Sequence, residues 1–147
     1  MRWALDFGGD DYNLAGYFGN KRWTYYRLRT ESHNTVMIDG ENQDRRGEAR
    51  ILRRELTEER ASVTFDLSGA YPGKLARHER TVSMPTRQSA RIVDEIDAPQ
   101  PVEVLWGMVT DADGDVHGAR AVLAKGGKVM TLRLSSPADG EFAIVST

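Results

Sequence analysis

The clearest hairpin of the sequence is Val122-Leu123-Ala124-Lys125-Gly126-Gly127-Lys128-Val129-Met130, in which apolar residues flank a glycine pair. Adjacent glycines supply the positive φ angles that a two-residue hairpin turn needs. Outward from this stretch, apolar residues also recur at every second position in residues 62–68, 102–108, 130–134 and 142–144. A period of two is typical of strands with one buried face. The pattern therefore predicts short antiparallel strands.

Turn-forming residues separate these segments at short intervals. They are Asp39-Gly40, Tyr71-Pro72-Gly73, Ala98-Pro99-Gln100-Pro101, Asp111–Asp115, Gly126-Gly127 and residues 137–140. Many short strands with turns at this spacing are typical of sandwiches and barrels. We therefore predict an all-β fold, an antiparallel β-sandwich of about ten strands.

The segment from Glu48 to Arg60 permits two interpretations. Leu52 and Leu56 are four residues apart among charged residues, which could form one face of a helix. Residues 50–57 could equally be a strand that pairs with residues 62–67. We favour the strand, because an isolated helix with so narrow an apolar stripe is only marginally stable.

Composition excludes several classes of protein. The chain has 147 residues, a formal net charge of −2 and no cysteine. This length suits a single domain. The charge gives no general attraction to nucleic acid or to an anionic membrane, and the absence of cysteine excludes disulfide frameworks, zinc ribbons and thiol nucleophiles. No apolar run approaches the roughly 18 residues of a membrane span, and the N-terminus lacks the pattern of a signal peptide.

Residues 8–35 differ in composition from the rest of the chain. They are rich in glycine and asparagine, and five Tyr or Trp residues fall between Tyr12 and Tyr26. Long loops of this kind are often functional, and aromatic rings can stack on the faces of sugars. The alternative is that the rings cover one end of the sandwich.

The three histidines lie in different contexts. We expect His78, among charged residues, and His117, beside a turn, to be exposed to solvent. His33 instead lies in a polar cluster at the start of an apolar strand. It could bind a metal together with a carboxylate such as Asp6, which ends the apolar strand expected over residues 3–5, or it could simply be a hydrogen-bonded histidine at a strand end.

The acidic run Asp111–Asp115 resembles a calcium-binding loop only at first sight. An EF-hand loop that starts at Asp111 would need glycine where Val116 stands and glutamate where Val122 stands. We interpret the run as a polar hairpin turn between two strands.

The first third of the chain resembles a known family. The matching residues are Arg2-Trp3-Ala4-Leu5-Asp6-Phe7-Gly8, Asp10-Asp11-Tyr12-Asn13-Leu14, Trp23-Thr24-Tyr25-Tyr26-Arg27, Ser32-His33-Asn34-Thr35 and Asp39-Gly40-Glu41-Asn42-Gln43, with a looser match at Asp94-Glu95-Ile96 and Val104-Leu105-Trp106. These stretches are similar to the start of the C-terminal β-sheet domain of heparinase II/III-like proteins. We expect residues 1–147 to be that domain, a fragment of a larger bacterial protein with an upstream helical toroid.

The resemblance implies a polysaccharide lyase, a carbon–oxygen lyase that cleaves glycosaminoglycans and other uronic-acid-containing polysaccharides by β-elimination. Its partners would be an acidic polysaccharide and the toroid of the same protein. The family's catalytic tyrosine and histidines lie in the toroid or just before this stretch, so we expect the chain alone to be inactive. The compartment, periplasmic or cytoplasmic, stays open.

The resemblance also implies a zinc site. Asp6 and His33 match two of the family's three protein ligands, and the third is a histidine that precedes the position of residue 1. By their positions around His33, we expect Tyr26, Arg27 and Asn34 to face the substrate, with Arg27 suited to a uronate or sulfate group. Two alternatives stay open, a non-catalytic carbohydrate-binding sandwich and a purely structural domain.

Overall fold

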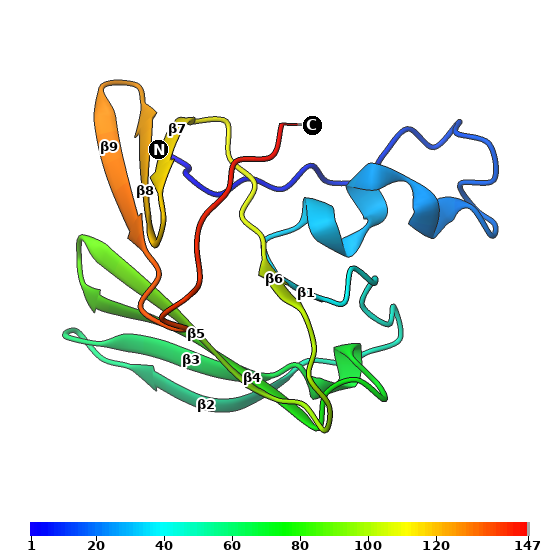
Figure 1. Cartoon of the computed structure of the whole chain (residues 1–147), viewed down its shortest axis with the longest axis horizontal. Helices are drawn as coiled ribbons and strands as arrows, with labels where there is room; N and C mark the ends of the chain where they lie inside the picture. Colours follow the sequence, from blue (N-terminus) through cyan, green and yellow to red (C-terminus); the bar gives the residue numbers. More distant parts are fainter. Residues whose placement is uncertain (147) are drawn as a thin grey trace. The chain divides into compact units, whose positions relative to one another are not determined.

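The computed structural model describes residues 1–146 and divides the chain into two compact units (Figure 1). Unit 1 combines Met1–Asp6 with the residues from Met108 onward. Unit 2 is the continuous segment Phe7–Gly107. Each unit is described separately below.

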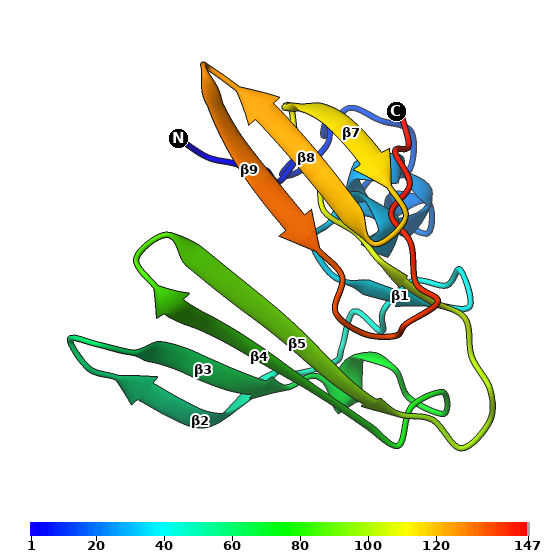
Figure 2. The ribbon, with the colours of Figure 1, turned by 60° about the vertical axis from the view of Figure 1, so that its left-hand side comes forward.

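Unit 2 contains a four-stranded antiparallel sheet with the order β2-β3-β4-β5. Its strands are β2 (Arg50–Leu56), β3 (Ala61–Asp66), β4 (Arg77–Thr86) and β5 (Ser89–Asp97). Consecutive strands are neighbours, which gives a simple meander (Figure 2). The strand expected over residues 50–57 is therefore confirmed together with its partner, and the helical alternative is wrong.

A two-stranded sheet completes the β-structure of unit 2. β1 (Val36–Ile38) pairs antiparallel with β6 (Val104–Trp106), so that Val36 lies opposite Trp106. The buried core beside it contains Val36, Ile38, Tyr71 and Leu75, with partly buried Leu67, Ala70, Ile96, Ala98, Val102 and Trp106 around them. β1 and β6 supply Val36, Ile38 and Trp106 to this core and β5 supplies Ile96, so both sheets contribute to one core, as the layers of a β-sandwich do.

Unit 1 contains a three-stranded antiparallel sheet with the order β7-β8-β9. Its strands are β7 (Asp113–His117), β8 (Arg120–Lys125) and β9 (Lys128–Arg133). Gly126 and Gly127 join β8 to β9 with φ angles of 55° and 71°, which confirms the expected hairpin. Ala121 and Leu123 of the central strand are buried.

The all-β, antiparallel class is confirmed, with nine strands and no α-helix among residues 1–146. Four short 3-10 turns occur: η1 (Arg22–Thr24), η2 (Tyr26–Leu28), η3 (Thr30–Ser32) and η4 (Ser68–Ala70). No helix in this part of the chain has the length and hydropathy needed to span a membrane.

Three local expectations were wrong. Residues 3–5, an apolar run, and residues 142–144, which alternate, were expected to be strands, but neither segment forms one. The hydrogen bonds from Leu5 N–H to the Val109 carbonyl and from Phe142 N–H to the Gly118 carbonyl, both 2.8 Å, are not part of a strand ladder. Asp113 and Asp115 lie inside β7 rather than in a turn. β7 is an edge strand with mostly exposed side chains, so it tolerates acidic residues.

Candidate functional site

The segment from Thr30 to Val36 carries His33 and Asn34 and connects η3 to β1. Its beginning is fixed by two residues beyond the Asp39-Gly40 turn. The Asn42 side-chain oxygen accepts a hydrogen bond from Thr30 N–H at 2.9 Å, and Gln43 N–H donates to the Thr30 hydroxyl at 2.7 Å. The Gln43 side-chain amide donates to the Thr35 hydroxyl at 3.1 Å, so Asn42 and Gln43 both order this segment.

His33 itself is half-buried at the end of η3. Its backbone N–H donates to the Thr30 carbonyl at 3.1 Å, and its carbonyl accepts from Thr35 N–H at 3.0 Å. Asn34 follows, also half-buried, and its carbonyl accepts a hydrogen bond from the Arg80 guanidinium at 3.1 Å. The backbone on both sides of the imidazole is thus fixed by hydrogen bonds.

Tyr26 and Arg27 lie in η2, a few residues before His33, and both are exposed. The Tyr26 ring lies 6.1 Å from the Phe7 ring, centroid to centroid, and the Arg27 guanidinium carbon lies 5.8 Å from the centroid of the same ring. An exposed guanidinium on an aromatic face keeps its donors available for a carboxylate or sulfate.

Asp6 is the last residue of the first segment of unit 1, and it is exposed, whereas His33 belongs to unit 2. Within residues 1–146, no three His, Cys, Asp or Glu side chains gather as a metal site would need. The two side chains are a carboxylate and an imidazole, which are donors of the kind that zinc binds in proteins.

His78 was expected to be exposed, and this expectation was wrong. Its side chain is 0% exposed, and its Nε2 atom lies 2.7 Å from the Asp94 Oδ1 atom. The reason is strand geometry: the charged neighbours Arg77 and Glu79 point to the opposite face of β4 from His78. The next residue on the same face of β4 is Arg80, which is also buried but charged, so an apolar alternation gave no signal for the burial of His78.

Arg80 completes a buried polar cluster with His78 and Asp94. Its Nε and Nη2 atoms donate to the two carboxylate oxygens of Asp94 at 2.7 and 2.9 Å, a bidentate ion pair. Burial alone would raise the pKa of Asp94, but the hydrogen bonds from His78 and Arg80 hold that pKa below its ordinary value. Asp94 is therefore ionised at neutral pH.

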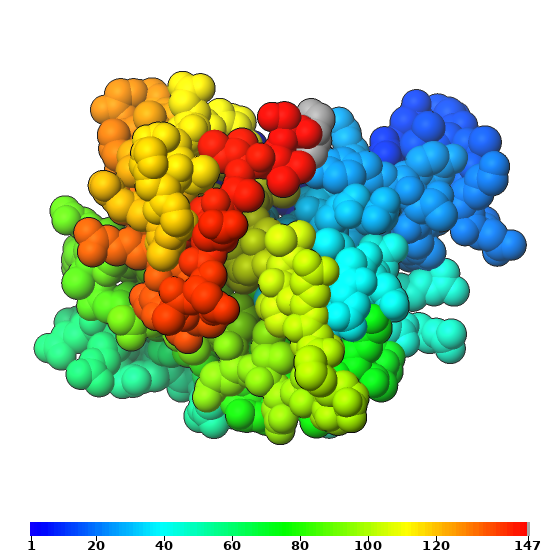
Figure 3. Space-filling model, viewed as in Figure 1, coloured from blue at the N-terminus to red at the C-terminus, as the bar shows by residue number. Residues whose placement is uncertain are grey.

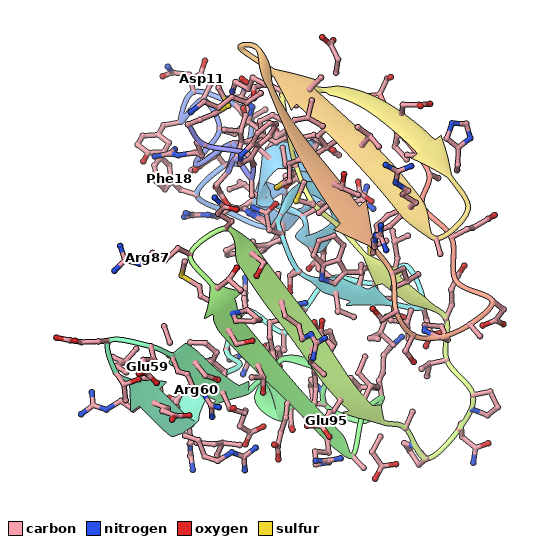
Figure 4. The ribbon with its side chains drawn as sticks, turned by 90° about the vertical axis from the view of Figure 1, so that its left-hand side faces the viewer. Asp11, Phe18, Glu59, Arg60, Arg87 and Glu95 are labelled. Atoms are coloured by element: carbon pink, nitrogen blue, oxygen red, sulfur yellow. The ribbon has the colours of Figure 1, made fainter. Side chains whose placement is uncertain are left out.

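A cluster of three aromatic rings lies in the loop before η1. Tyr17 is buried, whereas Tyr12 is 65% and Phe18 is 77% exposed, and the ring centroids are 5.1 to 5.8 Å apart. Figure 4 shows the Phe18 and Asp11 side chains directed outward from this loop. In Figure 3 the loop, drawn in blue, projects beyond the cyan residues around β1. The loop therefore exposes two of the aromatic rings that the sequence indicated as a surface for stacking on sugars.

The fold and these contacts define an all-β domain with an ordered polar segment and an exposed aromatic loop. The family model of the heparinase II/III-like, C-terminal domain matches residues 1–146. The chain belongs to this family, and the membership supports its assignment to a family of polysaccharide lyases. The comparison with curated proteins gives no significant match.

Proposed function

We propose that the chain is the C-terminal β-domain of a polysaccharide lyase that cleaves uronic-acid-containing glycans by β-elimination. The observation that carries this proposal is the family match over residues 1–146. The reaction removes the proton at C5, protonates the leaving oxygen at C4 and requires that the uronate carboxylate be neutralised. In this proposal the β-domain supports the substrate cleft, and an upstream helical domain supplies the catalytic groups.

Arg27 is the residue of this chain best suited to bind a uronate or sulfate group. Its side chain is exposed and bears a permanent positive charge with donors in a planar fork. We assign Tyr26 and Asn34 to the same substrate-facing surface, because they flank His33 in the sequence. These three residues bind and orient the polysaccharide, and they neither remove nor supply the transferred proton.

Asp6 and His33 are proposed to bind zinc, together with a histidine that precedes the position of residue 1 in the resembling family. Support comes from the resemblance and from the donor chemistry of a carboxylate and an imidazole. When bound, zinc would have a structural role, because it would fix the backbone positions of its ligands. The isolated chain supplies two of the three ligands, so its zinc affinity is expected to be low.

The lyase proposal is tested by following the ultraviolet absorbance of the unsaturated uronate product. The chain alone should release no product from heparin-like or alginate-like polymers. The complete lyase with Arg27→Ala should show KM raised about tenfold, the cost of one lost charge-assisted contact, with kcat less affected. The matched control is Arg87→Ala, which alters an exposed arginine of the turn between β4 and β5. Product release by the chain alone would contradict this division of roles.

A second candidate function, non-catalytic glycan binding, is favoured by the exposure of Tyr12 and Phe18. Large exposed aromatic side chains on an ordered loop are a common feature of binding surfaces. If the loop binds glycans, Phe18→Ala should weaken binding of the chain to oligosaccharides at least about tenfold, the typical effect of losing a central aromatic contact. Unchanged binding in Phe18→Ala, measured by calorimetry, would reject this function.

A further inference from the structure

The backbone carbonyls of four consecutive residues, 33 to 36, each accept a hydrogen bond from a different donor. The Thr35 N–H donates to His33, the Gly107 N–H to Thr35 and the Tyr71 hydroxyl to Val36, at 3.0, 2.9 and 2.7 Å. The remaining carbonyl, that of Asn34, accepts from the Arg80 Nη1 atom at 3.1 Å. Arg80 is thus the charged donor among the four, and it comes from the four-stranded sheet.

The position of the Arg80 guanidinium is itself tightly determined. Arg80 lies directly opposite Asp94 in the register of β4 and β5, and two of its nitrogen atoms bind the two carboxylate oxygens. His78, two residues earlier on the same face of β4, binds the same carboxylate. The third guanidinium nitrogen of Arg80, Nη1, donates to the Asn34 carbonyl. The planar fork of arginine makes this three-way geometry specific, and lysine cannot reproduce it.

Removing the charged groups of this cluster from water costs free energy, so the cluster is a poor means of stabilising the fold. Arg80 is 9% exposed and His78 is fully buried, and the Nδ1 atom of His78 has no hydrogen-bond partner. Buried ion pairs usually add little stability compared with apolar side chains of the same volume. They do define geometry, because both charges require their partners in fixed directions. The cluster therefore fits a positioning role better than a stabilising one.

We infer that Arg80, oriented by Asp94 and His78, is a positioning residue that fixes the Asn34 carbonyl and thereby the direction in which His33 and Asn34 present their side chains. The inference rests on the proposed function insofar as that function assigns ligand roles to these two residues. The physical statement about the backbone of residues 33–35 does not depend on zinc or on a glycan.

Amide hydrogen exchange of the 147-residue chain tests the positioning directly. In Arg80→Lys, which keeps the charge beside Asp94 but loses the fork, the amides of Thr35 and Gly107 should exchange at least about tenfold faster. The amides of β3, in the same sheet, should keep their rates. The double variant Arg80→Met with Asp94→Leu, which replaces the pair by apolar groups, should show the same local change. Arg53→Lys is the control, because the Arg53 side chain is 67% exposed where it pairs with Glu79.

Uniform acceleration in β3 and in residues 33–35 would mean that the cluster only stabilises the fold, and unchanged exchange at Thr35 and Gly107 would mean that it does not position the segment. Either result overturns the inference.

Zinc titration then separates the positioning inference from the proposed function. Loss of binding in His33→Ala supports the zinc assignment, and Arg80→Lys should then weaken binding about tenfold, as loss of an outer-shell partner does. Unchanged binding in Arg80→Lys would overturn the inference.

If His33→Ala leaves zinc binding unaltered, or if the wild-type chain binds no zinc, the zinc part of the proposed function fails. The exchange experiment still decides whether Arg80 positions the segment, because its readout needs no metal.

Discussion

The carboxylate of Asp94 is the counter-charge of the buried Arg80 guanidinium. Replacing it by alanine in Asp94→Ala would leave the Arg80 guanidinium buried without a counter-charge. Loss of one partner of a buried ion pair typically costs about 3 to 5 kcal/mol. We expect a reduction of this size in the free energy of unfolding, measured by urea denaturation. The control is Asp115→Ala, since Asp115 is 71% exposed beside His117, and it should cost less than about 1 kcal/mol.

The same carboxylate should make stability depend on pH in the acid range. Its pKa in the folded state lies below the ordinary value of 3.8, because the contacts with His78 and Arg80 outweigh the effect of burial. Its ionised form therefore stabilises the fold above pH 3.8, and this contribution is lost as the pH falls through the lower folded-state value. The stability difference between the wild type and Asp94→Asn should be largest near neutral pH and should shrink below pH 3.8.

Other carboxylates will also contribute to the acid transition of the wild type. Asp39, Asp66 and Asp111 have pKa values below the ordinary range because of hydrogen bonds from Glu103, Ser68 and Lys125, respectively. They are present in both proteins, so the difference between wild type and Asp94→Asn isolates Asp94. A difference that is constant between pH 7 and pH 2.5 would contradict the assigned direction of its pKa.

The sequence predicts some residues of the site region well and others poorly. Asn42 and Gln43 belong to the motif that carried the family resemblance, and the structure shows what they bind. His78 was misjudged because its sequence neighbours are charged, and strand geometry sends those neighbours to the other face. The Arg80–Asp94 pair was missed because it joins two strands, and a single sequence does not give the register between them.

The hairpin turn between β8 and β9 depends on the backbone conformation of its two glycines. Gly127 has a φ angle of 71°, and a Cβ atom added there would meet nothing within 4 Å. The cost of a substitution should therefore come from the backbone alone. Gly127→Val should reduce stability by about 1 to 2 kcal/mol, whereas Gly127→Asn should cost clearly less, because asparagine tolerates positive φ. Thermal unfolding of both variants, with exchange of the β8 and β9 amides, measures this. Equal losses would contradict the turn geometry.

Elements formed by neighbours in the chain were the ones predicted correctly. The hairpin of β8 and β9 and the pairing of residues 50–56 with 61–66 both follow from adjacent segments. The pairing of β1 with β6 joins residues about 70 positions apart, since Val36 lies opposite Trp106, and periodicity alone cannot reveal it. The apolar run at residues 3–5 and the alternation at residues 142–144 also predicted strands that do not form, because a strand needs a hydrogen-bonded partner along its length.

The family match assigns the chain as a whole to the C-terminal domain of heparinase II/III-like proteins, and the all-β fold agrees with it. The structure of residues 1–146 adds a physical account of how the segment with His33 and Asn34 is held. Four neighbouring carbonyls are each bound by a separate donor, and one of these donors belongs to a buried ion pair.

The central claim, that Asp6 and His33 give this domain a zinc site in support of a lyase, is tested most directly by zinc titration of the metal-stripped chain. Calorimetry and the melting temperature should both be followed, for the wild type, His33→Ala and Asp6→Ala. His117→Ala is the control, because His117 is an exposed histidine outside the proposed zinc site. We expect weak, saturable zinc binding by the wild type and by His117→Ala, and no binding by the other two variants. Identical titrations for the wild type and His33→Ala would contradict this expectation.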